Sequence, residues 1–315
     1  MRMIGRTLPA YSATPWQRLL KRIVGNWVLY LFLIPCLVYL ALFNYWPMAG
    51  IQIAFRDFKA AKGVWNSPWV GFLHFQRFFD SYQFRELVWN TVSLSFYQII
   101  AGFPLPIILA LLLNYTTIPR MKRFAQTVTY APHLISVVVM AGMLIVFSAP
   151  RGLFNQITGL FGAKPFAMLG SPSLYQPMYV WSTAWQRTGY HAVLYIAALS
   201  SVSDELHEAA IVDGANKLKR ILHIDLPSIL PTMMILLILS LGNLMSIGFE
   251  KSYLLQNNLN LSVSEIISTY VYKIGIQGAQ YSYSAAIGIF NNVINLMLLV
   301  TVNKISNKLT GSGLW

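Results

Sequence analysis

The sequence is poor in charge. Only 10% of its 315 residues are Asp, Glu, Lys or Arg, whereas 56% are hydrophobic, and the mean hydropathy is +0.54. Soluble domains carry about a quarter charged residues, and so little polar surface cannot cover a core of this size. We therefore exclude an ordinary soluble fold and expect lipid to cover part of the molecule. The net charge of +13 comes from basic residues near the ends of apolar runs, which is typical of membrane topology rather than of nucleic-acid binding.

Cysteine and phosphate-binding motifs are also scarce. Cys36 is the single cysteine and lies within an apolar run, so an intrachain disulfide is excluded and the compartment stays open. The sequence contains no G-x-x-x-x-G-K-[ST] loop. We therefore expect this chain to hydrolyse no ATP itself. We also expect it to be no enzyme and to hold no cofactor of its own, although an intramembrane enzyme is weighed below.

Six apolar runs approach the length of about 20 residues that a helix needs to cross a bilayer. The second run is interrupted by Pro104 and Pro106, and the fourth is the least apolar because it contains Arg187 and His191. The first is too long for the apolar core of a signal peptide and lacks a small-residue cleavage site after it, so we expect it to be retained. The six runs are 27–46, 88–113, 127–147, 177–202, 228–248 and 285–302.

These runs predict an all-α membrane protein with a short N-terminal segment, 1–26, and a transmembrane domain, 27–315. Six spans place both termini on one side, and that side holds thirteen of the 23 Lys and Arg residues against nine on the other. Since positive charge is retained in the cytoplasm, we expect both termini to be cytoplasmic.

The acidic residues gather between the fourth and fifth spans. Half of the ten lie there, namely Asp204, Glu205, Glu208, Asp213 and Asp225. Ser203 can cap a helix with an acidic first turn, which the helix dipole favours, and Asp213-Gly214 signals a break. We expect two short helices hinged at Gly214 in a cytoplasmic loop, 203–227.

This loop has two other interpretations that the residues alone permit. A solvated amphipathic helix lying against lipid headgroups would show the same charge pattern. His207-Glu208 begins like the zinc motif H-E-x-x-H, but Ile211 stands where the second histidine is required. We therefore reject the metal site and expect no metal ligands here.

The loop resembles the EAA loop of inner-membrane permeases from binding-protein-dependent ABC importers. That family's pattern is E-A-A, three residues, G, nine residues, I, one residue, L-P. Every fixed position is matched, by Glu208, Ala209, Ala210, Gly214, Ile224, Leu226 and Pro227. The stretch WVGFLHFQRFF resembles the family's W-V-G-F-x-N-F pattern after the first span, with His74 where asparagine is usual. The stretches YAPHLISVVVMAGM and YSYSAAIGIFNNVINL resemble the branch that imports oligosaccharides and polysaccharides. The resemblance covers the chain beyond its N-terminal tail.

The resemblance implies a type I ABC importer permease fold in a bacterial inner membrane. Loop 203–227, including Asp213, would be the coupling helix that docks on a cytoplasmic ATPase, with Glu208 paired to a basic residue there. It implies two copies of that ATPase, which bind ATP and Mg, a second permease chain that family precedent favours as a paralogue, and a periplasmic or lipid-anchored solute-binding protein. The substrate implied is a carbohydrate, and Arg187 with the basic outer loops would tolerate an acidic one such as an alginate oligomer.

Polar side chains within or beside the spans are the candidates for the substrate pathway, because burying them in lipid is costly. Arg187 and His191 are four residues apart and share a helix face, and aromatic neighbours could stack on sugar rings. The candidates are Trp185, Arg187, Tyr190, His191, Asn243 and Glu250. An Arg187 that snorkels to headgroups and a Glu250 in an ordinary loop remain open alternatives.

A secondary transporter or channel that works alone is the main alternative function. It would predict internal repeats and paired ionisable groups at mid-membrane, and neither is clear in the sequence. An intramembrane enzyme would need a nucleophile–base pair or a metal cluster, which Arg187 and His191 do not supply. The sequence leaves open the exact substrate and whether the second permease is identical or a paralogue.

Overall fold

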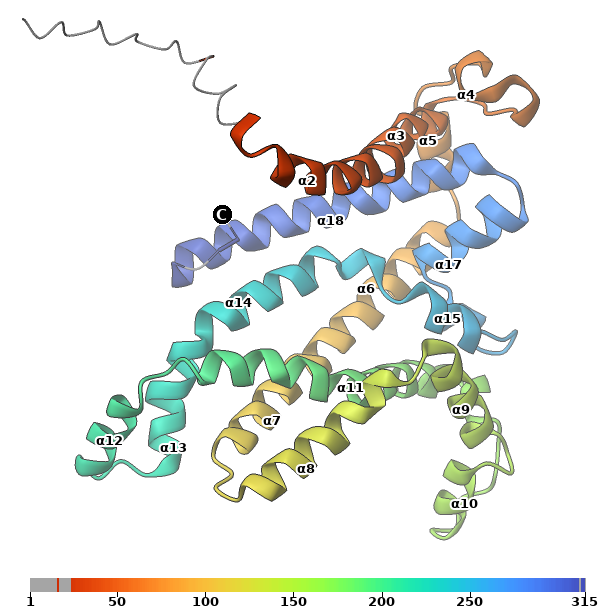
Figure 1. The fold of residues 1–315 in the computed structure, drawn as a ribbon. Helices are drawn as coiled ribbons and strands as arrows, with labels where there is room; N and C mark the ends of the chain where they lie inside the picture. The colour runs from red at the N-terminus through yellow and green to blue at the C-terminus, as the bar shows by residue number, and fades with distance from the viewer. Residues whose placement is uncertain (1–15, 17–23, 312, 315) are drawn as a thin grey trace, which may run out of the picture. The chain divides into compact units, whose positions relative to one another are not determined.

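The computed structural model describes residues 16, 24–311 and 313–314 (Figure 1). These residues form helices joined by turns, with one isolated bridge between Arg56 and Trp69, so the all-α prediction is confirmed for them. The chain divides into two compact units, residues 1–52 and 53–315.

The first unit contains an apolar helical run that reaches into η2, Ala49–Phe55. The run consists of α2 (Trp27–Leu40), the π-helical η1 (Ala41–Tyr45) and α3 (Trp46–Met48). No charged residue occurs from Trp27 to Phe55, and this stretch of 29 residues is long and apolar enough to cross a membrane. Pro35 lies inside α2 and Pro47 in the first turn of α3.

The second unit begins with short outer helices and then forms the second span. The elements are η3 (Ala60–Lys62), α4 (Gly63–Asn66), α5 (Leu73–Phe79), α6 (Gln83–Gly102) and α7 (Pro104–Asn114). Helix α6 gives way to α7 at Phe103. Pro104 has no backbone N–H to donate to the preceding turn, but proline is well tolerated in the first turn of a helix. The interruption expected at these prolines is therefore present.

The third expected span, 127–147, is not a single helix. The chain forms α8 (Pro119–Tyr130), η4 (Ala131–Leu134), α9 (Val137–Ser148) and α10 (Leu153–Gly159). Pro132 stops the first helix, and the Ser136 hydroxyl starts the next by accepting from the Val139 N–H. The stretch that meets the length and hydropathy of a span is Val137–Gly159.

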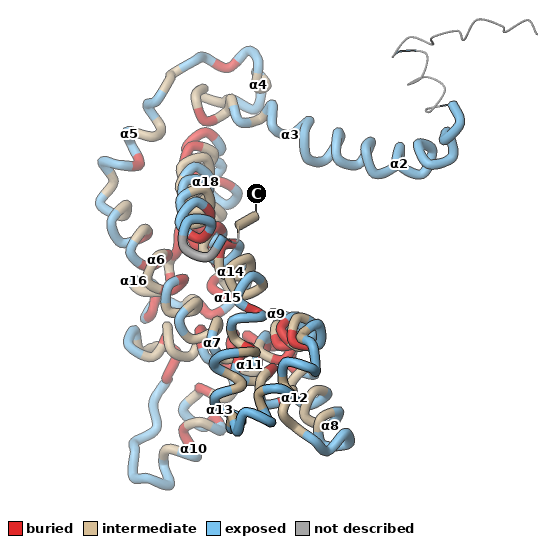
Figure 2. The backbone as a smooth tube through the Cα atoms, turned by 90° about the vertical axis from the view of Figure 1, so that its left-hand side faces the viewer, coloured by how far each residue is buried: buried red, intermediate tan, exposed pale blue. Residues whose placement is uncertain are grey.

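The long helix α11, Pro172–Leu199, follows the turn η5 (Met168–Gly170) and is the most extensively packed element of the second unit. It contacts α6, α7, α8 and α14, and Figure 2 shows buried positions along it. Its buried side chains include Tyr175, Tyr179, Val180, Ala184, Ala192 and Tyr195. With Arg187 and His191 within it, α11 is not among the five helices of the described chain that are apolar enough to span.

The charged loop is helical on both sides of Gly214, as the sequence predicts. The helices are α12 (Asp204–Val212) and α13 (Lys217–Arg220), followed by η6 (Ile221–Asp225) and α14 (Leu226–Gly242). The second is not a separate short helix, because α13, η6 and α14 form one continuous helix, Lys217–Gly242. Ser203 and Asn216 cap the two helices by accepting from the N–H groups of Glu205 and Lys219. Gly214 separates them with φ of 75°, a left-handed conformation that costs glycine little.

The fifth span ends at Gly242, before the limit expected at residue 248. A side chain at position 242 would overlap Leu299 of α18, so the glycine allows two helices to approach closely. Beyond it lie η7 (Leu244–Ser246), α15 (Phe249–Leu255), α16 (Leu261–Ser264), α17 (Ile267–Tyr272), η8 (Lys273–Gln277) and α18 (Tyr281–Thr310).

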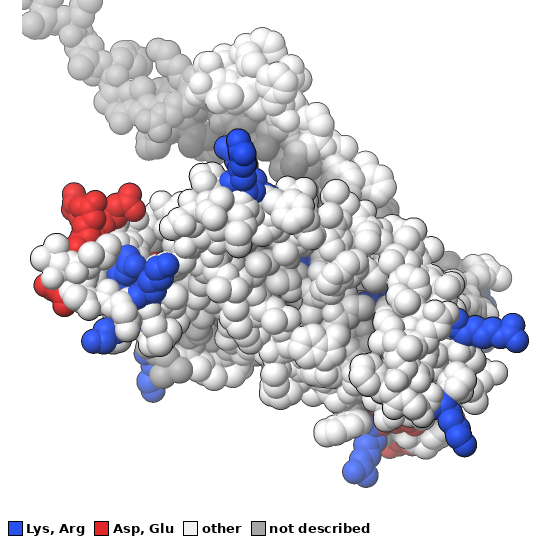
Figure 3. All heavy atoms as spheres, turned by 90° about the horizontal axis from the view of Figure 1, so that it is seen from below, with Lys and Arg blue, Asp and Glu red and all other residues white. Residues whose placement is uncertain are grey.

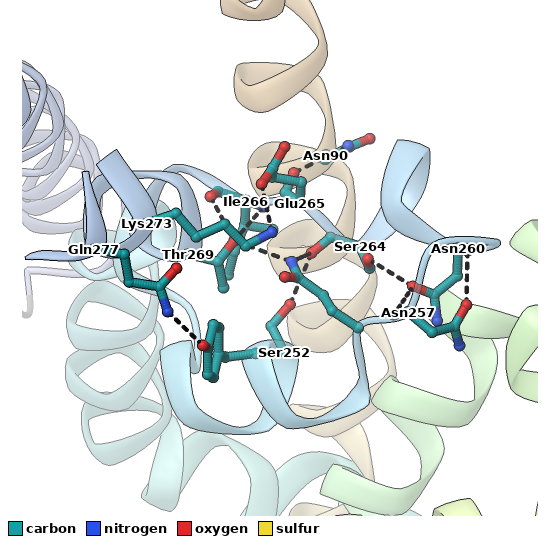
Figure 4. A network of polar contacts seen from close by, with 12 residues as sticks. Asn90, Ser252, Asn257, Asn260, Ser264, Glu265, Ile266, Thr269, Lys273 and Gln277 are labelled. Carbon is teal, nitrogen blue, oxygen red and sulfur yellow. Dashed lines mark hydrogen bonds and ion pairs between the residues drawn. The ribbon is translucent and has the colours of Figure 1, made fainter. Parts of the chain in front are cut away.

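Polar contacts hold the segment from α15 to η8 in place (Figure 4). The Asn90 amide donates to the carbonyls of Ser262 and Glu265, at 2.8 and 3.1 Å. Lys273 pairs with the Glu265 carboxylate at 2.8 Å, and the Ser252 hydroxyl donates to the Ser264 carbonyl. These contacts give an irregular segment a fixed position against α6, because its backbone groups have partners.

Candidate functional site

A cavity of about 590 Å³ lies between α6, α7, α11 and the region where α14 ends. Apolar groups from all four elements line part of it. Its polar lining consists of Ser95, Gln98, Thr183, Arg187, Thr188, His191, Tyr195, Ser240, Asn243 and Ser246. No Asp or Glu is among the residues that line it. The cavity therefore offers hydroxyl, amide and cationic groups together.

One face of α11 supplies the cationic part of this lining. Arg187 and His191 are one turn apart, and both line the cavity with Thr183 and Tyr195. Within the described residues Arg187 makes no ion pair. The guanidinium therefore keeps its hydrogen-bonding capacity for a guest in the cavity.

Of the other candidate pathway residues, one lines the cavity and three do not. Asn243 lines the cavity, with its amide donating to the Leu239 carbonyl at 2.9 Å. Trp185 and Tyr190 are on other faces of α11, and Tyr190 stacks on His133 with ring centroids 4.1 Å apart. Glu250 is in the first turn of α15 and also lies outside the lining. Helical periodicity explains this outcome, because proximity in sequence does not place residues on the same face.

Lys251 is a buried lysine. The sequence places it beside Glu250 after the fifth span, either at the outer mouth of the pathway or in an ordinary loop, and neither interpretation predicts its burial. It is only 5% exposed, and its ammonium donates to Ser182 Oγ at 2.8 Å, to Thr183 Oγ1 at 2.6 Å and to the Tyr179 carbonyl at 3.0 Å. These three bonds use all the donors of the ammonium. Lys251 therefore attaches α15 to α11 at the level of Thr183, which itself lines the cavity.

The EAA segment lies on the surface of the second unit. No residue of α12 is buried, and Glu208 and Ala209 are exposed. Figure 3 shows acidic side chains at this end of the molecule, beside a group of Lys and Arg. Leu226 is half-buried and packs against the core cluster formed by α7, α11 and α14. The segment thus joins an exposed charged helix to a packed core.

Asp225 is the second feature that sequence reasoning missed. It occupies the variable position between Ile224 and Leu226 and is fully buried. Tyr115, directly after α7, donates its hydroxyl to Asp225 Oδ2 at 2.7 Å, and His207 Nε2 of α12 lies 3.3 Å from Oδ1. Burial, followed by this hydrogen bond, raises the pKa of Tyr115 to about 12. The sequence did contain a signal for this burial. Asp225 stands between the apolar Ile224 and Leu226, close to the expected start of a span.

Comparison with known proteins identifies the family. Residues 83–310 match the family described as the inner membrane component of binding-protein-dependent transport systems. This chain belongs to that family. It is 40% identical to Protein LplB of Bacillus subtilis (strain 168), over 98% of this chain and 96% of the relative. It is 38% identical to the polygalacturonan/rhamnogalacturonan transport system permease protein YteP of the same organism, over 95% and 94%.

Solved structures agree. A chain of a bacterial ABC transporter involved in the import of the acidic polysaccharide alginate is 37% identical, with a TM-score of 0.87 over 93% of this chain and 99% of that one. A structure of the alginate transporter with a pentasaccharide-bound periplasmic protein matches equally well, at 36% identity. The chain is therefore a non-catalytic, multi-pass permease of the inner membrane. It belongs to an ABC importer that works with a binding protein.

Proposed function

We propose that this permease forms half of the translocation pathway for an acidic oligosaccharide. The observation that carries the proposal is the cavity, which combines hydroxyl and amide groups with an arginine that has no ion pair among the described residues, and whose lining contains no carboxylate. Arg187 suits a carboxylate because its guanidinium binds one in a bidentate fashion, and the hydroxyls and amides suit the sugar. The relatives whose names refer to polygalacturonan and alginate point to the same class.

The chain would be driven by a separate ATPase that binds the ATP and Mg. Two copies of the ATPase would dock on the coupling helices of two permease chains. One of these is the present chain, and we propose that the other is a paralogue. In this chain the docking surface would comprise Glu208, Ala209, Ala210, Asp213 and Gly214, with Ile224, Leu226 and Pro227 passing the displacement into α14. The exposure of α12 supports such docking.

We propose six spans with both termini in the cytoplasm. Helix α11, at 28 residues, is long enough to be the span that hydropathy omits. Its polar face lines the cavity, and ionisable groups within spans are tolerated at such water-accessible surfaces. Loop 203–227 then lies between spans four and five, on the cytoplasmic side.

The first test is to tag the chain, extract it from its native membrane in mild detergent and identify the proteins that accompany it. An ATPase and a second permease-like chain are expected. A chain that is isolated alone and moves solute in liposomes without ATP would contradict the importer and favour a secondary transporter.

The second test measures ATP-driven uptake of trigalacturonate and of neutral maltotriose by the reconstituted complex. Arg187→Ala is expected to lower trigalacturonate uptake about tenfold or more, since a hydrogen bond to a charged group contributes about 1.5–3 kcal/mol. Arg151→Ala, which removes an exposed arginine outside the cavity, is the matched control. Unchanged trigalacturonate uptake in Arg187→Ala would show that Arg187 does not bind the substrate.

A further inference from the structure

Helix α12 is attached to the rest of the protein by few contacts. None of its residues is buried, and its backbone is connected to α11 and α13 through turns at Ser200–Ser203 and Asp213–Asn216. Among the described residues, the side chains of α12 make one polar contact beyond these turns, the approach of His207 Nε2 to within 3.3 Å of Asp225 Oδ1, which is an ion pair when His207 is protonated. A displacement of α12 therefore reaches the membrane helices through two short backbone turns and this single polar contact.

Asp225 connects three elements at one carboxylate. It is fully buried at the junction of η6 and α14. Its Oδ2 accepts from Tyr115, at the inner end of α7, and its Oδ1 faces His207 Nε2 of α12. The rings of Tyr115 and His207 are also in edge-to-face contact, with centroids 6.5 Å apart, and the Arg220 guanidinium lies 5.5 Å from the centroid of the Tyr115 ring.

A buried carboxylate resists separation from its partners, because an acid left without them in a low-dielectric environment is strongly disfavoured. We propose that Asp225 is the positioning residue that makes α12 move as one body with the inner ends of α7 and α14. This inference rests on the proposed docking of α12 on an ATPase. Asp225 occupies a position that the EAA pattern leaves variable. The inference gives it a role there, which is to transfer the displacement of α12 into α7 and α14 at once.

The test measures the distance between α12 and α14 directly and needs no substrate. Spin labels are placed at Val212→Cys and Leu230→Cys, both exposed, in a Cys36→Ser chain. The complex from the native membrane is measured without nucleotide and after trapping with ATP and vanadate. With Asp225 present, the distance distribution is expected to keep its centre and width in both states. With Asp225→Asn it is expected to broaden and to shift between the states.

His223→Ala is the matched control, because His223 is an exposed histidine of η6 whose ring contacts the Lys219 carbonyl of the same helical stretch. It is expected to leave the distribution unchanged. Tyr115→Phe and His207→Gln are each expected to broaden it. In an Asp225→Asn background, neither substitution is expected to broaden the distribution further, because the effects of substitutions that act through one group are not additive.

The melting temperature of each complex distinguishes the proposed role from a merely structural one. If Asp225 only stabilised the fold, Asp225→Asn would lower the melting temperature, and the label distance distribution measured at lower temperature would stay as in the parent. If Asp225→Asn does not assemble, His207→Gln, which removes the contact between α12 and Asp225, decides the question by the same measurement. A parent whose label distance changes on trapping, or an assembled variant that matches the parent, would overturn this proposal alone. A complex that lacks an ATPase would overturn the proposed function and this proposal with it.

Discussion

The backbone of Gly189 in α11 lies directly against the carbonyl of Thr129 in α8, so that a methyl group at position 189 would overlap this oxygen. Gly189→Ala must therefore push the two helices apart. We expect a loss of about 1–3 kcal/mol in stability, measured as a lower melting temperature of the purified chain in detergent. Gly142→Ala in α9, where nothing lies within 4 Å of the new methyl, is the control and should be neutral or slightly stabilising. Equal melting temperatures for the two variants would contradict this packing.

Lys251 and Lys273 lie in the same outer segment but differ in burial. Lys251 is buried and donates three hydrogen bonds to α11, whereas the Lys273–Glu265 pair is partly exposed. We expect Lys251→Ala to cost about 1.5–3 kcal/mol and Lys273→Ala at most about 1 kcal/mol. Thermal unfolding of both variants under one set of conditions tests this order, and the reverse order would show that α15 does not depend on its contact with α11.

Gly214 closes α12 with φ of 75° and lies in open space. Because the left-handed conformation is strained for most L-residues, Gly214→Ala should cost about 1 kcal/mol, whereas Gly214→Asn should cost less, since asparagine tolerates this conformation. The amount of ATPase that co-purifies and the stability of the chain are the two measurements. If alanine and asparagine behaved alike, the positive φ at this position would not matter for the loop.

Glu208 and Glu205 are both exposed on α12, which makes them a matched pair. We expect Glu208→Lys to leave membrane insertion intact and to abolish co-purification of the ATPase, because truncating one partner of a buried charge pair at an interface typically costs about 2–5 kcal/mol. Glu205→Lys should retain the ATPase. Retention of the ATPase by Glu208→Lys would remove Glu208 from the docking surface.

Local signals were sufficient for the coupling loop and for part of the cavity. Ser203 starts a helix through its side-chain hydroxyl and Gly214 ends it through its left-handed backbone, so the sequence alone predicts a helix on each side of Gly214. That the second helix continues through Pro227 into the span is seen only in the structure. The four-residue spacing of Arg187 and His191 likewise places both on one face of any helix. Whether that face borders a cavity depends on the helices that pack around α11, which no local pattern encodes.

The sequence by itself determined that this protein is helical, lies in a membrane and carries an EAA loop, because hydropathy and helix signals act over a few turns of chain. The tertiary structure decided which polar residues meet. Tyr115, His207 and Asp225 come from three separate elements, and their contact exists only once α7, α12 and η6 have packed. Lys251 similarly becomes a buried donor to α11 through an approach between residues about seventy positions apart.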